Sequence, residues 1–107
     1  MYAVIFEVEM NEGRDTRYFD LAAGLRTELE RIDGFISVER FESLTTRGKY
    51  VSLSFWRDEA AIARWREHEG HRTAQREGLS GIFRYFRIRV AQVVRDYDLN
   101  NRTPATA

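Results

Sequence analysis

The order in which two hydrophobic periodicities alternate along the chain sets the strongest limit on its fold. Four segments alternate with a period of two, which is typical of strands: residues 2–10, 35–42, 50–56 and 82–97. Two segments repeat apolar residues every three or four positions, which is typical of amphipathic helices: residues 16–33 and 59–77. The predicted order is therefore strand, helix, strand, strand, helix, strand. This order favours an α+β ferredoxin-like sandwich, with two helices on one face of a four-stranded antiparallel sheet.

Capping and turn residues mark where the two helices begin and end. Asp15 or Thr16 is expected to cap the first helix, because short polar side chains accept hydrogen bonds from free amides at a helix start. Gly34 is expected to end that helix in the left-handed conformation. Asp58 is the predicted cap of the second helix, and Gly70 is a candidate kink within it.

The composition supports one folded domain. With 107 residues and 43% hydrophobic content, the chain is long enough for a single core. We expect the domain over residues 1–97 and a polar tail over residues 98–107. The 17 basic and 17 acidic residues balance, so no net field attracts nucleic acid or an anionic membrane. Because the sequence has no cysteine, signal-peptide pattern or membrane-length apolar run, we expect a cytoplasmic protein.

Helices on one face of a sheet leave its other face bare. Tyr2, Val4, Phe6 and the apolar half of the last strand are predicted to lie on this bare face. An exposed apolar patch of this size is unusual on a monomer. We therefore expect a homodimer in which two sheets pack face to face.

The segment RYFRIRV alternates arginine with apolar residues, a pattern that also occurs in nucleic-acid-binding proteins. Without a net positive charge or a recognised motif, nucleic-acid binding is not expected. The better interpretation is that Arg87 or Arg89 pairs with Glu39 or Glu7 across the sheet. Cross-strand ion pairs of this kind help to fix the register of neighbouring strands.

Three segments resemble the antibiotic biosynthesis monooxygenase (ABM) domain, in particular its haem-degrading-monooxygenase-like branch. They are IDGFISVERFES, VSLSFWRDEAAIARWREHEGHRTAQREG and YFRIRVAQV, and the resemblance covers residues 2–97. It implies a dimeric α/β barrel, in agreement with the bare-face argument. The family includes cofactor-free oxygenases of polyketide aromatics, quinol monooxygenases and haem-degrading enzymes.

The resemblance to haem-degrading members is incomplete at their functional positions. Those members use an asparagine near the end of the first strand, a helical tryptophan and a histidine further along that helix. Trp65 matches the tryptophan, but the asparagine position falls at Glu7 or Val8 and the histidine position at Gln75. These departures argue against haem degradation by that mechanism. In an alternative, His71, one turn before Gln75, would hold a shifted haem.

The segment ARWREHEGHRTAQ contains both histidines and one of the two tryptophans of the chain. We predict His71, Trp65 and Glu7 as catalytic residues, with His71 the first-choice base because an imidazole exchanges protons near neutral pH. The predicted substrate-binding residues are Phe6, Phe55, His68, Arg72, Gln75 and Tyr85.

Each of these residues also has a purely structural interpretation. Trp65 and the other aromatic residues fit plain core packing, and Arg72 fits a solvated helix surface. His71 could instead donate to a backbone carbonyl at the helix bend. His68 and His71 are three positions apart, but no third ligand is marked, so no metal site is expected.

The predicted function is that of a small ABM-type monooxygenase. It would oxidise an electron-rich aromatic or quinol-like substrate with O₂, and the absence of a glycine-rich fingerprint argues against flavin or nicotinamide. No cofactor is therefore expected. The alternatives are a haem-binding or haem-degrading protein, a non-catalytic ligand-binding dimer module, and an isomerase or lyase on the same barrel.

Overall fold

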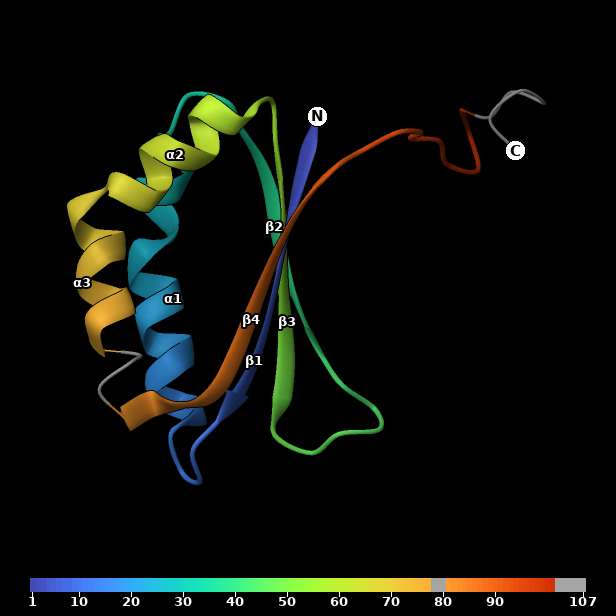
Figure 1. The fold of residues 1–107 in the computed structure, drawn as a ribbon. Coiled ribbons are helices and arrows are strands. Elements are labelled where there is room, and N and C mark those ends of the chain that lie inside the picture. Colours follow the sequence, from blue (N-terminus) through green and yellow to red (C-terminus); the bar gives the residue numbers. More distant parts are fainter. Residues whose placement is uncertain (78–80, 102–107) are drawn as a thin grey trace.

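The computed structural model describes residues 1–77 and 81–101, without the side chains of residues 69, 70, 74 and 75. The elements are β1 Tyr2–Met10, α1 Asp15–Glu30, β2 Phe35–Glu42, β3 Lys49–Trp56, α2 Glu59–Glu67, α3 Glu69–Glu77 and β4 Phe83–Gln92. The strands form one sheet in the order β2-β3-β1-β4, with every neighbouring pair antiparallel. The helices all lie on one side of this sheet (Figure 1). The α+β ferredoxin-like prediction is confirmed.

Two boundaries differ from the prediction. The second helical region is broken at His68, where the backbone turns extended (φ −61°, ψ 133°), and not at Gly70. The last strand ends at Gln92 and does not continue to Tyr97. Directly after the strand, the Val93 amide donates a hydrogen bond to the Met1 carbonyl at 2.9 Å, which still connects the chain to the sheet. The following segment then leaves the body of the domain (Figure 1).

The strand register decides which side chains face the helices, because directly paired residues project from the same face of a sheet. Val4 and Phe6 pack against residues of the core beneath the helices. Tyr2 is paired with the buried Trp56 and so lies on the same side. The prediction that Tyr2, Val4, Phe6 and the apolar half of the last strand lie on the bare face was therefore wrong, since Phe86, Ile88 and Val90 of β4 pair with helix-facing residues of β1. That face carries other apolar residues, namely Ala3, Ile5, Phe41, Val51, Leu53, Phe55, Tyr85 and Ala91.

The core between helices and sheet has two parts. One part is built from Val8, Met10, Tyr18 and Ile82, and the other from Leu29, Trp56 and Ala61. Trp56 is only 2% exposed, and its indole N–H donates to the Ser54 hydroxyl at 2.9 Å. Because a buried indole needs a hydrogen-bond acceptor, this pair lets Trp56 fill the core at the end of β3.

The free backbone amides at the starts of α1 and α2 are treated differently: a side chain caps α2 but not α1. The Asp58 carboxylate accepts from the Ala61 amide at 2.9 Å, which confirms the predicted cap of α2. At α1 the capping residue is Arg14 and no side chain caps the helix, so the predicted cap by Asp15 or Thr16 was wrong. Asp15 instead accepts from the Tyr50 hydroxyl at 2.7 Å. This hydrogen bond raises the pKa of Tyr50 to about 12.

Gly34 joins α1 to β2 at a crowded point. Its φ of +95° confirms the expected left-handed conformation. A Cβ atom at this position would lie 2.6 Å from the Cβ of Ala61 in α2. The Gly34 carbonyl also accepts from the Arg57 amide at 2.7 Å, which ties the start of β2 to the end of β3.

Candidate functional site

The break between α2 and α3 gathers one tryptophan and both histidines. The Trp65 ring stacks with the His68 ring (centroids 5.3 Å apart, 26° between planes) and with the His71 ring (4.7 Å, 25°). His68 ends α2, its amide donating to the Trp65 carbonyl, while its own carbonyl accepts from Arg72 in the next helix. The extended backbone at His68 therefore returns His71 toward Trp65, which a continuous helix would not do.

His71 has the most unusual environment of the candidate residues. Its Nδ1 atom is buried and has no hydrogen-bond partner in the described part of the chain. Burial lowers the pKa of His71, and the nearby His68 lowers it further. The backbone of Trp65 and Arg66 offsets part of this effect, although neither group bonds to Nδ1. At neutral pH the imidazole is therefore uncharged, and Nδ1 is unsatisfied.

The lowered pKa of His71 predicts how stability depends on pH. The unfolded chain takes up a proton on His71 below its ordinary value of 6.5, while the folded protein does so only at lower pH. We expect the free energy of unfolding to fall from about pH 7 to about pH 5, by at most about 1.4 kcal/mol per pH unit from this group. Urea unfolding of the wild type and His71→Gln should show a smaller decline in the variant. Equal declines would contradict a buried neutral imidazole.

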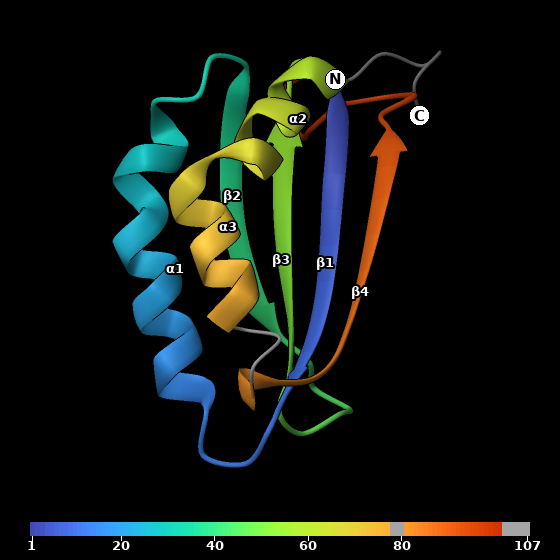
Figure 2. The same ribbon diagram turned by 60° about the vertical axis from the view of Figure 1, so that its left-hand side comes forward.

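An apolar surface lies on the helix side of β1 and β4. Phe6 in β1 contacts Phe83 and Phe86, with ring centroids 5.7 and 6.0 Å apart. Phe86, Ile88 and Val90, which we call the β4 strip, pair with helix-facing residues of β1 but are 41–48% exposed. No helix lies over β4 in Figure 2. The helix-side surface of β4 is therefore exposed.

Three predicted site residues do not belong to this surface. Glu7, Phe55 and Tyr85 project from the opposite face of the sheet, because their register partners lie there. The Glu7 carboxylate forms ion pairs with Arg89 at 3.0 Å and with Lys49 at 3.9 Å. The pair with Arg89 confirms the expected cross-strand ion pair. The prediction that Glu7, Phe55 and Tyr85 lie in one pocket with His71 was therefore wrong within this chain.

The remaining predicted residues divide into three cases. Phe6 and His68 lie with Trp65 and His71 on the helix side, as expected. Arg72 is exposed, and the break at His68 removes the helical spacing that related it to Trp65. Gln75 lies in α3, but its side chain is outside the described residues.

Arg40 is an inward residue that the sequence interpretation missed. It pairs with Ser52, which in turn pairs with Phe6, so it projects toward the helices. Its guanidinium carbon lies 5.9 Å from the centroid of the Tyr18 ring in α1. The strand is regular from Ser37 to Glu42, so simple alternation from Val38 predicts this placement. A charged residue two positions after Val38 was the available signal.

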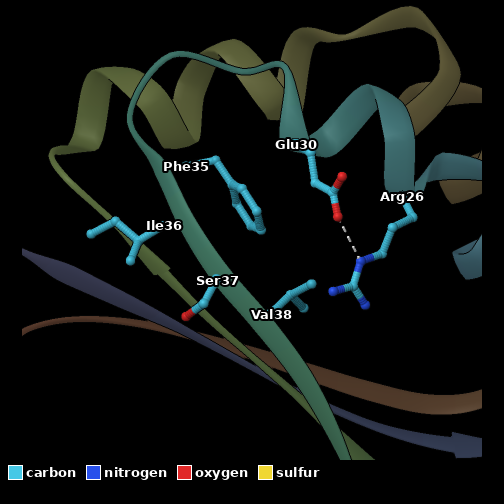
Figure 3. Close-up of a pocket in the computed structure, with 6 residues that line it drawn as sticks. All are labelled: Arg26, Glu30, Phe35, Ile36, Ser37 and Val38. Carbon is cyan, nitrogen blue, oxygen red and sulfur yellow. Dashed lines mark hydrogen bonds and ion pairs between the residues drawn. The ribbon is translucent and has the colours of Figure 1, made fainter.

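An open pocket of about 390 Å³ lies between the C-terminal half of α1 and the outer strand β2 (Figure 3). It is lined by Arg26, Glu30, Phe35, Ile36, Ser37 and Val38. Arg26 and Glu30 pair with each other at 3.0 Å, so the polar wall is internally neutralised. The pocket contains none of the predicted site residues, and a chamber beside Trp65 stays a prediction.

Metal and membrane features can be stated for the described residues. No cluster of three or more metal-ligating side chains occurs there. None of the helices is long and apolar enough to span a bilayer.

Comparison with known proteins assigns the family. The sequence model described as antibiotic biosynthesis monooxygenase, or ABM, matches residues 1–77, which is more than half of the chain. The chain belongs to the ABM family. This assignment confirms the resemblance found in the sequence.

Two curated relatives match most of this chain. A protein of Pyricularia oryzae named jasmonate monooxygenase ABM is 44% identical over 93 residues, which are 87% of this chain but 43% of that protein. The chain thus spans less than half of this relative. YqjZ, an uncharacterized protein of Bacillus subtilis, is 34% identical over 88% of this chain and 80% of its own length.

Solved structures share the fold of this ABM chain at low sequence identity. A protein of Deinococcus radiodurans has a TM-score of 0.81 and 12% identity, covering 92% of this chain and 98% of its own. Rv0793 of Mycobacterium tuberculosis has a TM-score of 0.80 and 18% identity, covering 91% and 98%. These likenesses concern the fold alone.

Proposed function

We propose that this chain is a monooxygenase that uses O₂ to oxidise an electron-rich aromatic or quinol-like substrate, without flavin or nicotinamide. Membership of the ABM family and the relative named as a monooxygenase support the reaction class. The observation that carries the proposal is the buried, unpaired Nδ1 of His71 beside Trp65. An uncharged imidazole with a free nitrogen can accept a proton at neutral pH.

The reaction needs no external reductant when the substrate supplies the electrons. His71 removes a proton from an acidic CH₂ group of the substrate, such as the one in anthrone. The resulting carbanion transfers one electron to O₂, and the radical pair combines to a peroxide anion, to which His71 returns its proton to give a hydroperoxide. Loss of the second C–H proton and of hydroxide from this hydroperoxide gives a carbonyl, and that proton and hydroxide together form the water molecule. The balance is R₂CH₂ + O₂ → R₂C=O + H₂O.

The aromatic residues would hold a flat substrate on the helix side. Trp65 and Phe6 offer ring faces and edges that lose little conformational entropy on binding. The β4 strip would cover the rest of the substrate and keep water from its carbanion. Exclusion of water protects the carbanion from simple reprotonation before O₂ reacts.

The partner in this proposal is a second copy of the chain. The bare face presents apolar residues of all four strands and the ion pairs of Glu7 and Glu9 with Arg89 and Arg84, and no element within the described residues covers it (Figure 1). Two such faces can pack together, since each carries both signs of charge.

Dimer formation through the bare face predicts the effect of a single charge. Leu53→Arg puts an arginine in the centre of this face, and we expect light scattering to show a change from dimer to monomer mass. Leu44→Arg, at a fully exposed position in the β2–β3 turn, is the matched control and should stay dimeric. A wild-type monomer at micromolar concentration would contradict the proposed assembly.

Oxygen uptake by the purified protein without added cofactor tests the function. The panel would contain anthrone, several hydroquinones and, because of the relative's name, jasmonate. We expect uptake with at least one anthrone or quinol, and none above background with Trp65→Ala. If uptake appears only after hemin is added, with a Soret band that His71→Ala removes, the haem-binding alternative replaces this proposal.

A further inference from the structure

We propose that Arg40 is the residue that binds the negatively charged end of the ligand, and that this end is the carboxylate of a flat, largely apolar organic acid. This inference rests on the proposed function only for the statement that the ligand is a substrate. Three features support the binding site itself: the helix-facing placement of Arg40, the unpaired Nε of its guanidinium and the aromatic surface next to it.

Arg40 is half-buried and projects from β2 toward the helices. Its Nε atom is buried and has no hydrogen-bond partner in the described part of the chain. None of the ion pairs between described residues involves Arg40. The guanidinium carbon of Arg40 lies over the ring of Tyr18, a residue that is 6% exposed. A buried donor on a charged group is costly unless an acceptor satisfies it.

The chemistry of this position favours one carboxylate. A guanidinium offers parallel N–H groups that fit the two oxygens of a carboxylate. The Tyr18 ring would keep the guanidinium plane fixed, so little further ordering is needed on binding. One guanidinium balances one negative charge, and the aromatic surroundings favour an organic acid over inorganic phosphate.

A row of paired residues connects Arg40 to the candidate site. Arg40, Ser52, Phe6 and Ile88 are successive partners across the four strands, all on the helix side. With roughly 4.8 Å between neighbouring strands, the row spans about 14 Å, the length of an acid with two or three fused rings. Trp65 packs against the same part of the core as Val38, the helix-facing residue before Arg40. The ligand would therefore run from Arg40 across Phe6 to the β4 strip, beneath the helices.

The competing interpretation is structural. A long arginine side chain can bury its stem while its charged end stays in water. In that case Arg40 packs on Tyr18 and has no preference for any ligand. The two interpretations differ in ligand charge, which can be tested without changing the protein.

Binding of 1-hydroxy-2-naphthoate and of its uncharged methyl ester, measured by calorimetry on the full chain, tests the inference. We expect the acid to bind at least tenfold more tightly than the ester. Arg40→Gln should remove this preference, lowering the affinity for the acid at least tenfold and leaving that for the ester unchanged. Arg40→Lys should keep part of the preference, and Arg47→Gln, the same charge change in an exposed turn, should keep all of it.

Three outcomes would overturn the inference. They are equal affinities of the wild type for the acid and the ester, failure of both probes to bind, and a preference for the acid that survives in Arg40→Gln. Unchanged ester binding in Arg40→Gln shows that the variant is folded. Tight acid binding without oxygen uptake would leave the Arg40 site in place and contradict the oxygenase. Oxygen uptake with quinols, together with equal affinities for acid and ester, would support the oxygenase and overturn the Arg40 site.

Discussion

Replacing His71 with glutamine is expected to lower the rate of oxygen uptake by about 10² to 10⁴-fold at neutral pH, the range typical for loss of a general base. Glutamine preserves a polar side chain of similar reach but cannot accept a proton. Without this base, the substrate would have to lose its proton to water before it could react with O₂. The expected loss lies in kcat, measured with an oxygen electrode, because the ring contacts of Trp65 and Phe6 remain.

The pH dependence separates a base from a structural histidine. At a pH above the pKa of the substrate's own acidic group, the substrate arrives already deprotonated, and the rates of wild type and His71→Gln should converge. Arg66→Gln, on the exposed surface of α2, is the matched control and should behave as the wild type. A rate deficit in His71→Gln that is the same at every pH would contradict the role of His71 as a base.

Gly34→Ala is expected to lower the free energy of unfolding by about 3 kcal/mol. The left-handed conformation costs a residue with a Cβ roughly 1–2 kcal/mol, and crowding of a packed core typically adds about 1–3 kcal/mol. The added Cβ would lie 2.6 Å from the Cβ of Ala61, so α2 must move or the turn must rearrange. Urea unfolding of both proteins measures the difference.

Gly24→Ala is the matched control for this substitution. Gly24 lies in the middle of α1, where an added Cβ meets nothing within 4 Å. Alanine there should raise the stability by up to about 1 kcal/mol, because it favours the helix. If both substitutions changed the stability equally, the close approach of Gly34 to α2 would be wrong.

The elements were predictable from the sequence because their periodicities are strong. The alternation in residues 2–10 and 50–56, the Gly34 turn and the Asp58 cap depend on local preferences, and each occurs where expected. The sheet order then follows from few alternatives for this succession of elements.

The facing of β1 was assigned wrongly from its first half, which is apolar on both sides. Its second half carries the signal, since Glu7 and Glu9 alternate with the buried Val8 and Met10 and so predict which face the helices cover. This choice also decided the candidate site. Once Phe6 and Val8 faced the helices, Glu7 had to face away.

The break at His68 was outside the reach of local signals. Glycine is the usual cause of such a break, and Gly70 is nearby, but the extended residue is His68. Tertiary contacts favour this position, since it allows Trp65 to stack with both imidazoles. Arg40, in contrast, was predictable from alternation, since it lies two positions after the helix-facing Val38 in a regular part of β2.

The central claim is that the substrate anion itself reacts with O₂, and isotope labelling tests this most directly. Wild-type protein would be incubated with anthrone under ¹⁸O₂, without added cofactor or reductant, and the quinone and the water analysed by mass spectrometry. The account predicts one labelled oxygen in the new carbonyl and one in water, formed at a rate that depends on His71. Unlabelled quinone, hydrogen peroxide as the oxygen product, or a rate equal to that without protein would contradict it.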